Sequence, residues 1–267
     1  MKKTIKMPAP QLSWLKEVNI DLDMTGRHYA LLASCEGQLP EEVALSILKD
    51  LVEEDANQLT LAELRYLFML VKIENLENEY TVTAICQHHK KDGTLCNHEN
   101  HVKVFISDAD LNPTSSDYEP PKIKFRRDNT EKEYSVLEPP VNRIVELYNY
   151  FQTSRNATSL DIEKDDELKR DFSMLYGLLH LYDSEGNPFV KETDNFSDLI
   201  DTGYMEDNKT PKPTVININK FTSFNKLLDY TLQVDSFGVQ TKEYDIVCEE
   251  CGGRIVFQLP LLNGLVD

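Results

Sequence analysis

The chain has 267 residues, with 28 lysines and arginines against 46 aspartates and glutamates, which gives a formal net charge of −18. With 40% hydrophobic residues, its composition is that of a globular protein of one or two domains and excludes a disordered chain. The charge argues against a protein that binds duplex DNA or anionic membranes, because such proteins neutralise phosphates with clustered lysine and arginine. No apolar run reaches the roughly 18 residues that a transmembrane helix needs.

The first residues and the cysteines indicate the compartment. Residues 1–6 are similar to the start of a signal peptide, but a proline-marked stretch stands where an apolar region would follow. Five cysteines are an odd number for disulfides; four of them gather into two groups, and Cys35 stands alone. We therefore expect an intracellular protein with reduced cysteines, in which Cys35 is a small buried or half-buried residue. The lone tryptophan, Trp14, is expected to be a packing anchor.

Two helices are predicted after an irregular, proline-marked opening. The first begins at Pro40, and the two acidic residues that follow it suit the positive end of a helix dipole. The second begins at Thr60, because Glu63 stands at the spacing of a capping box, in which each side chain accepts a backbone N–H of the other residue. Apolar residues recur near the 3.6 period along both segments, which predicts a helix hairpin with a wide apolar face.

The next segment changes to strand-like patterns. Residues 79–85 are rich in β-branched side chains and alternate with period two, which predicts a strand that leads directly to Cys86. After a polar loop and Cys96, a second alternating strand runs through Val102 and Val104. These patterns predict a hairpin closed by two cysteines.

The remaining periodic segments predict another hairpin, three helices and a terminal pair of strands. They are residues 122–126 with 134–137 for the hairpin, helices that start at Pro139-Pro140, at Ile162 and at Phe221, and strands at 244–248 and 254–259. The helix that starts at Ile162 is expected to continue to Leu181. Residues 183–213 are rich in Asp, Asn, Gly and Pro, which predicts a loop insertion with one short helix at 195–205.

The terminal strands enclose Cys248-x-x-Cys251-Gly252, which has the form of a zinc knuckle. Two thiolates three positions apart can face one metal ion, and a glycine directly after them accepts the left-handed backbone that this turn requires. One knuckle supplies only half of a tetrahedral site. A second pair of ligands is therefore expected elsewhere in the chain.

The hairpin around Cys86 and Cys96 has the pattern expected of the second half. In both hairpins alternating strands flank the cysteines, and the apolar residues after the second cysteine lie at even offsets from it, so the apolar faces correspond. We infer a zinc ribbon whose first knuckle carries an insertion, Cys86-x9-Cys96. The expected ligands of one structural Zn²⁺ are the four thiolates of Cys86, Cys96, Cys248 and Cys251.

Three alternatives to this site stay open. In the first, the terminal pair is redox-active, although such pairs stand at a helix N-terminus and a strand is predicted after Cys251. In the second, the two cysteine pairs are unrelated buried residues without a metal. In the third, His88 or His98 replaces one thiolate in a Cys₃His site. A catalytic zinc is not expected, because no His-Glu-x-x-His helix occurs.

Other chemical motifs are weak. The sequence contains no Gly-x-Ser-x-Gly elbow and no glycine-rich phosphate loop, so an enzyme is not expected. Lys122, Lys124 and Arg126 alternate along one strand, as on a surface for an acidic partner or nucleic acid, and equally as on an ordinary solvent-facing strand. His180 lies in the apolar half of a helix and is expected to be a packed core histidine.

Several of these motifs together carry a resemblance to a known family. They are the N-terminal helix hairpin, residues 80–86 with Cys96-Asn97-His98, the pair Pro139-Pro140, and Cys248-Glu249-Glu250-Cys251-Gly252 followed by Leu259-Pro260-Leu261. In this order, across residues 40–262, they resemble the baseplate hub assembly proteins of T4-like contractile-tailed bacteriophages. The resemblance implies a non-enzymatic role in building the central hub of the tail baseplate. It also implies other hub and tail proteins as partners, in the host cytoplasm during assembly or in the virion baseplate.

The expected architecture is a mixed α+β fold, with zinc-ribbon-like β-hairpins from both halves, an N-terminal helix hairpin and a helical middle. The expected regions are a helical region 1–78, a first knuckle and β region 79–138, a helical region 139–241 with the insertion 183–213, and a knuckle hairpin 242–267, with 79–267 as one folded unit. The competing function is a zinc-ribbon regulator that binds RNA polymerase or nucleic acid. The charge of −18 disfavours its nucleic-acid form.

Overall fold

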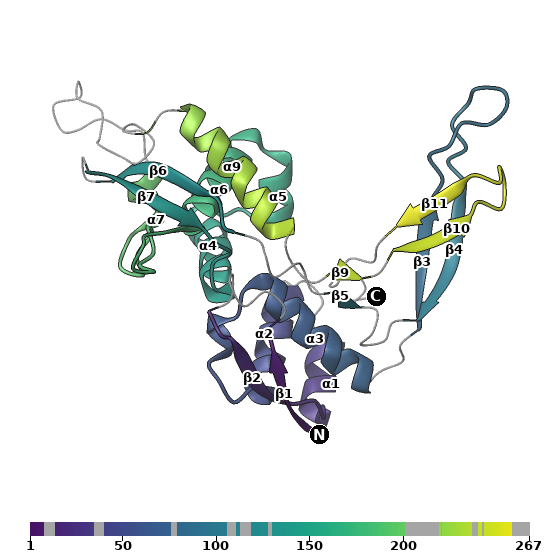
Figure 1. The fold of residues 1–267 in the computed structure, drawn as a ribbon, viewed down its shortest axis with the longest axis horizontal. Coiled ribbons are helices and arrows are strands. Elements are labelled where there is room, and N and C mark those ends of the chain that lie inside the picture. Colours follow the sequence, from purple (N-terminus) through teal and green to yellow (C-terminus); the bar gives the residue numbers. More distant parts are fainter. Residues whose placement is uncertain are drawn as a thin grey trace.

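Two hydrophobic cores and a projecting pair of hairpins make up the described part of the chain (Figure 1). The computed structural model describes residues 1–7, 14–34, 40–75, 79–105, 111–112, 119–127, 130–200, 219, 221–236, 240–241 and 243–257. Helices and small antiparallel sheets follow one another along these residues, so the fold is mixed α+β, as predicted.

The first core is built mainly from the N-terminal part of the chain, and Val104 and Val141 also belong to it. Its elements are β1 (Lys2–Lys6), β2 (Glu17–Asp21), α1 (Gly26–Ala33), α2 (Pro40–Leu51), the 3-10 helix η1 (Ala56–Gln58) and α3 (Leu61–Asn75). β1 and β2 pair antiparallel, and Val18 and Ile20 of β2 are buried in one cluster with residues of α2 and α3. The prediction of an irregular opening is therefore wrong for these strands, because in five-residue segments two apolar positions are too few to form a clear pattern.

The predicted hairpin of α2 and α3 is confirmed. The Thr60 N–H donates to Glu63 Oε2 at 2.8 Å, and the Glu63 N–H donates to Thr60 Oγ1 at 3.3 Å, so the capping box starts α3. The two helices contribute buried residues to the first core, among them Ile47, Leu48, Leu64 and Leu67. The apolar face of the hairpin is thus the main wall of that core.

The second core surrounds a three-stranded antiparallel sheet of order β6-β7-β8. Its elements are β6 (Lys122–Arg127), β7 (Thr130–Val136), α4 (Val141–Ser154), α5 (Ser159–Lys164), α6 (Asp166–Leu179), β8 (Leu181–Tyr182), α7 (Phe196–Ile200) and α9 (Phe221–Ser236). The predicted hairpin is confirmed, with Ile123 opposite Tyr134. Aromatic side chains fill this core, where the Phe125 ring meets the rings of Phe189 and Phe224 edge-on.

The single helix predicted from Ile162 to Leu181 is wrong. The chain forms two helices there, α5 and α6, and Leu181 already belongs to β8. The break lies at Asp165, whose backbone is extended and whose carboxylate accepts the N–H groups of Glu167 and Leu168. An aspartate with this geometry is a strong N-cap, so it begins a new helix and does not continue the old one.

The other helix predictions have a simpler outcome. α4 and α9 confirm the helices expected after Pro139-Pro140 and from Phe221. Within the predicted insertion, α7 covers residues 196–200 of the expected short helix. The rest of that helix, from residue 201 onward, lies outside the described residues.

The projecting hairpins come from two segments that are far apart in sequence. The first pairs β3 (Glu79–Ile85) with β4 (Glu99–Phe105), and the second pairs β10 (Tyr244–Val247) with β11 (Arg254–Phe257). Between them in sequence, β5 (Leu111–Asn112) pairs with β9 (Gln240–Thr241). This short ladder joins the segment after β4 to the segment before β10, and the two hairpins project together to one side of both cores (Figure 1).

Trp14 helps to join the two cores. Its Nε1 donates to the backbone oxygen of Glu138 at 3.1 Å, and its ring centroid lies 4.6 Å from that of Tyr182. Nearby, the Val141 N–H donates to the Leu59 oxygen at 2.7 Å. The expectation that Trp14 is a packing anchor is confirmed, and the predicted domain boundaries stay predictions.

Candidate metal centre

The two hairpins place their cysteines at equivalent positions. Continuing the β3–β4 register puts His98 opposite Cys86, and the Cys86 N–H donates to the His98 oxygen at 2.9 Å. In the second hairpin Gly253 stands opposite Cys248, and the Cys248 N–H donates to the Gly253 oxygen at 2.8 Å. In each hairpin, the residue opposite the first cysteine is therefore the residue two positions after the second cysteine.

The turns that follow the second cysteine of each pair are also equivalent. Asn97 and Gly252 both have positive φ angles, 49° and 73°. Each donates its N–H to the backbone oxygen of the first cysteine of its own pair, Cys86 or Cys248, at 2.9 Å in both cases. Asparagine is one of the few residues with a side chain that adopts this backbone readily, so Asn97 serves where the second knuckle has a glycine.

The nine residues between Cys86 and Cys96 form an extension of the first hairpin. The Cys96 N–H donates to the His88 oxygen at 2.8 Å, and the Lys90 N–H donates to the Thr94 oxygen at 2.7 Å. His89 and Leu95 form an isolated antiparallel β-bridge. The two arms of the insertion are thus paired antiparallel through their backbone hydrogen bonds. The two cysteines remain neighbours, as in a compact knuckle.

The structure brings all four predicted ligands together. The sulfur atoms of Cys86, Cys96, Cys248 and Cys251 all lie within 4.8 Å of one another. Across the hairpins, Cys86 Sγ lies 3.5 Å from Cys251 Sγ, and Cys96 Sγ lies 3.8 Å from Cys248 Sγ. A tetrahedral zinc with Zn–S bonds of about 2.3 Å has sulfur–sulfur edges of about 3.8 Å, so the donor set fits this ion. The two cysteine pairs are therefore adjacent in the structure, and the binding of a metal between them stays a prediction.

The geometry also bears on the other two alternatives. Cys248 and Cys251 stand between β10 and β11, not at the start of a helix, so they lack the dipole that activates redox pairs. The cluster consists of four sulfurs and, among the described residues, no imidazole. His88 is close, with its Nδ1 3.6 Å from Cys86 Sγ, but its ring also packs against the backbone of Gly253. We therefore place His88 beside the ligands and not among them.

The surroundings set the protonation of the thiols. Burial raises the pKa of Cys248, but backbone N–H groups at Cys251 and Glu250 lower it, and the net result is a pKa of about 6. At Cys86 a backbone N–H of His88 lowers the pKa, while burial and the neighbouring thiols raise it to about 12. Burial also raises the pKa of Cys96. Cys86, Cys96 and Cys248 therefore do not ionise together on their own, and a bound divalent metal would displace protons from the protonated thiols.

Sequence reasoning missed Asn100, a buried residue of β4 next to the cysteines. Its Nδ2 lies 3.7 Å from Cys248 Sγ, and its Oδ1 accepts the Glu249 N–H at 3.0 Å. A signal was present, because Asn100 stands at the same parity as Val102 and Val104 and so had to face inward. A polar side chain at an inward position is informative, because it needs a buried partner.

The weaker candidates from the sequence have separate outcomes. His180 is fully buried and its Nδ1 contacts the Tyr176 oxygen at 2.9 Å, which confirms a packed core histidine. On the basic strand, Lys124 stands opposite Glu133 and Arg126 opposite Glu131, as on a solvent-facing strand. Cys35 lies outside the described residues.

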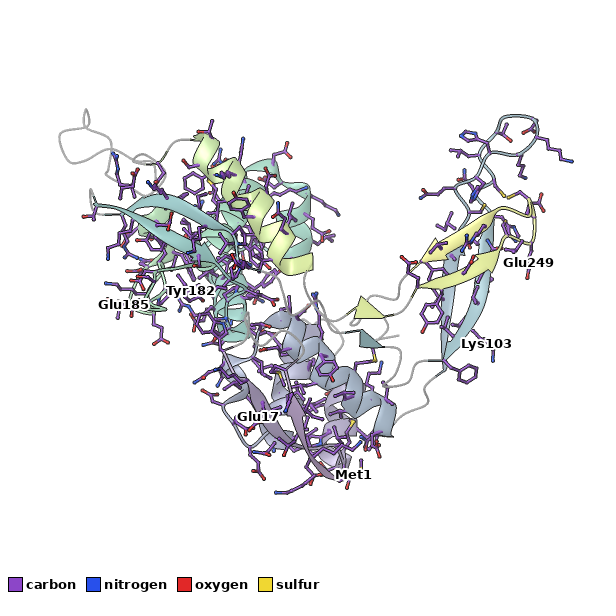
Figure 2. The ribbon with its side chains drawn as sticks, viewed as in Figure 1. Met1, Glu17, Lys103, Tyr182, Glu185 and Glu249 are labelled. Carbon is purple, nitrogen blue, oxygen red and sulfur yellow. The ribbon has the colours of Figure 1, made fainter. Side chains whose placement is uncertain are left out.

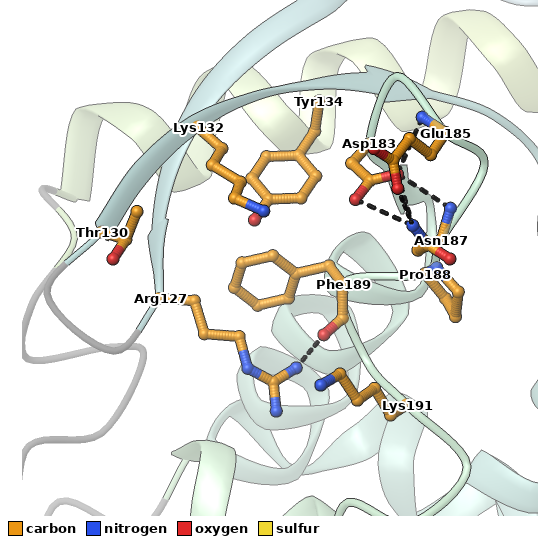
Figure 3. A pocket seen from close by; sticks show the side chains of 10 residues that line it. All are labelled: Arg127, Thr130, Lys132, Tyr134, Asp183, Glu185, Asn187, Pro188, Phe189 and Lys191. Atoms are coloured by element: carbon orange, nitrogen blue, oxygen red, sulfur yellow. Dashed lines mark hydrogen bonds between the residues drawn. The ribbon is translucent and has the colours of Figure 1, made fainter.

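A second feature is a cavity of about 570 Å³ beside β6 and β7 (Figure 3). Arg127 points into it, but this guanidinium already pairs with Asp194 at 2.8 Å and donates to the Phe189 oxygen. Acidic and basic side chains both line the cavity, namely Asp183, Glu185, Lys132 and Lys191. Among the described residues, the lining contains no serine, cysteine or histidine.

Comparisons with protein-family models, curated proteins and solved structures found no match to this chain. Among the described residues, no helix combines the length and apolar character needed to cross a membrane. The strongest functional observation is therefore the cysteine cluster itself.

Proposed function

We propose that the chain is a structural or assembly protein of the central hub of a contractile phage tail baseplate. It acts through protein–protein contacts and is held in shape by one structural Zn²⁺, bound by Cys86, Cys96, Cys248 and Cys251. The observation that carries the proposal is the convergence of four thiols from two hairpins, of which Cys96 and Cys248 lie 152 positions apart in sequence. The phage role rests on the resemblance of the motif order.

The donor set favours a structural role for the metal over a catalytic one. Catalytic zinc sites keep one position open for water or substrate, whereas four protein thiolates fill a tetrahedron. Three of the four cysteines are buried and Cys251 is half-buried, so little room is left for a substrate at the ion. When bound, the metal supplies folding free energy by tying the two hairpins together.

The outer faces of the hairpins support a role in protein contacts. Large apolar side chains are exposed there: Ile85 at 53%, Phe105 at 64%, Val247 at 66% and Val256 at 49%. Ile85 and Val256 also line one groove between β3 and β11. Apolar surface that gathers on one part of a molecule is typical of a binding face. Figure 2 places Lys103 and Glu249 on the same projecting arm, far from Met1 and Glu17 of the first core.

The competing proposal is a zinc-ribbon regulator that binds RNA polymerase or nucleic acid. Residues 243–257 of the second hairpin contain one basic residue, Arg254. They also contain four acidic residues, Glu243, Asp245, Glu249 and Glu250. Four thiolates around a divalent ion add further negative charge. This electrostatic field repels phosphates, which favours a protein partner over nucleic acid.

The test is to recover partners of the tagged chain from infected bacterial cells. We expect hub or tail proteins to co-purify, and one zinc ion per chain in the purified protein. Val256→Asp places a charge on the exposed apolar face and should reduce capture while zinc content stays unchanged. Leu232→Asp, at a residue of α9 that is 69% exposed, is the matched control. Recovery of RNA polymerase without tail proteins would contradict the baseplate role and support the regulator.

A further inference from the structure

Asn100 is a polar residue at a position that does not need one. It is only 4% exposed and stands in β4 two residues after His98, which is opposite Cys86. The equivalent residue of the second hairpin, two after Gly253, is the apolar Ile255. The ribbon geometry by itself therefore accepts an apolar side chain there. The amide of Asn100 must be explained by its own contacts, because a buried polar group is costly without partners.

These contacts reach both half-sites at once. In its own hairpin, Asn100 Nδ2 donates to the oxygens of Ala84 at 3.1 Å and His98 at 3.2 Å. Across the interface, the same Nδ2 lies 3.7 Å from Cys248 Sγ, and Oδ1 accepts the Glu249 N–H at 3.0 Å. One side chain is thus fixed on the first hairpin and holds the backbone and a sulfur of the second knuckle.

We propose that Asn100 is a positioning residue for the metal centre, which sets the second knuckle against the first before the ion binds. This inference rests on the proposed zinc site. Its N–H group supports the negative sulfur of Cys248, and its oxygen fixes the turn that carries both Cys248 and Cys251. Groups that orient metal ligands in this way commonly affect metal affinity about 10–100-fold.

Two near-isosteric variants separate this role from general stability. Asn100→Leu removes the amide without changing charge, and Thr81→Val makes a similar change at an exposed position of β3. Zinc affinity is measured on the whole chain by competition with a chromophoric chelator. We expect Asn100→Leu to bind zinc about 10–100-fold more weakly than the wild type, and Thr81→Val to bind it equally well.

Cobalt provides a readout that a purely structural role would not change. Thiolate-to-cobalt charge-transfer absorption reports how many sulfurs bind the ion, so it should weaken in Asn100→Leu if the second knuckle is out of place. Asn100→Asp keeps the size and the acceptor oxygen but loses the donor to Cys248, so we expect it also to bind zinc more weakly. This variant tests the proposal if Asn100→Leu fails to fold.

The possible outcomes are distinct. Wild-type affinity and an unchanged cobalt spectrum in both Asn100 variants would overturn the positioning role and leave the zinc site in place. A wild-type chain that takes up neither zinc nor cobalt would overturn the zinc site, and with it this role. Weaker binding in both variants, with Thr81→Val unchanged, supports the inference.

Discussion

Cys86 and Cys251 hold their Sγ atoms 3.5 Å apart, although 165 positions separate them in the chain. The contact joins the first hairpin to the second, and Cys96 and Cys248 make a parallel contact at 3.8 Å. A metal bound among these sulfurs would close a loop that contains the whole second core. Because closing a longer loop removes more freedom from the unfolded chain, such a cross-link is expected to stabilise the fold.

Removal of the metal should loosen the hairpins before the cores. The cysteine cluster is separate from the two large hydrophobic clusters, whereas the opposite ends of the hairpins pack against the first of them, in which Val104 of β4 is buried. Chelation is therefore expected to make the cysteine ends of the hairpins, residues 86–98 and 248–253, sensitive to protease while most of the helical circular dichroism remains. Limited proteolysis followed by mass spectrometry maps the cuts. Equal protection of both hairpins with and without zinc would contradict the proposed cross-link.

Replacement of a predicted ligand should have a larger effect than replacement of Cys35, which is not a predicted ligand. Cys248→Ser removes one of the four sulfurs and leaves a buried hydroxyl among three thiols, so we expect loss of bound zinc, and unfolding of the two hairpins with a tendency to aggregate. Cys35→Ser is the matched control and should retain one zinc per chain. Zinc content and thermal unfolding measure both. A Cys248→Ser protein with unchanged zinc and unchanged melting temperature would show that the cysteines are incidental.

The contact between Gly253 and His88 predicts a packing effect. A Cβ added at Gly253 would lie 2.7 Å from Cγ of the His88 ring, which is closer than atoms approach without a shift. Gly253→Ala should therefore destabilise the ribbon by about 1–3 kcal/mol, and His88→Ala in the same chain should restore most of the loss. Gly26→Ala is the control, since nothing lies within 4 Å of its added Cβ. Thermal unfolding of the wild type, the two single variants Gly253→Ala and His88→Ala, the double variant and Gly26→Ala tests the coupling; additive effects would argue against the contact.

Much of the site could be predicted from sequence because a zinc knuckle is a local pattern. Cys248-x-x-Cys251-Gly252 places two sulfurs and a left-handed turn within five residues, and strand parity then relates this hairpin to the one around Cys86. The role of Asn97 is less visible in the sequence, because it depends on the register that leads to Cys96. The pairing of the inserted residues 87–95 was also not predictable, because it depends on backbone hydrogen bonds and not on a side-chain pattern.

What could not be predicted depends on contacts between distant segments. β1 and β2 gain their burial from helices that come later in the chain, so their own short patterns are weak. Asn100 has its partners at Cys248 and Glu249, which only the packing of the two hairpins brings near. The break at Asp165 is different, because an aspartate before an acidic first turn is a local N-cap signal that here outweighs the apolar periodicity.

The ion pair of Asp194 and Arg127 predicts how the second core responds to acid. Burial raises the pKa of Asp194, but the hydrogen bonds that its carboxylate accepts from Arg127 and from the Lys191 N–H lower the pKa by more. The folded pKa is therefore below the usual 3.8. The pair therefore stabilises the fold fully above pH 3.8, and this contribution is lost as the pH falls through the lower, folded pKa. Asp194→Asn should cost about 1–3 kcal/mol at pH 7 and much less at pH 2.

Thermal unfolding at a series of pH values measures this difference. The melting temperatures of the wild type and Asp194→Asn should converge as the pH falls, because protonated Asp194 and asparagine both lack the charge that pairs with Arg127. Glu192→Gln removes one charge from an exposed side chain nearby and is the control, for which we expect a small and nearly constant difference. A gap between wild type and Asp194→Asn that stays constant from pH 7 to pH 2 would mean that Asp194 contributes by shape and hydrogen bonding alone, without its charge.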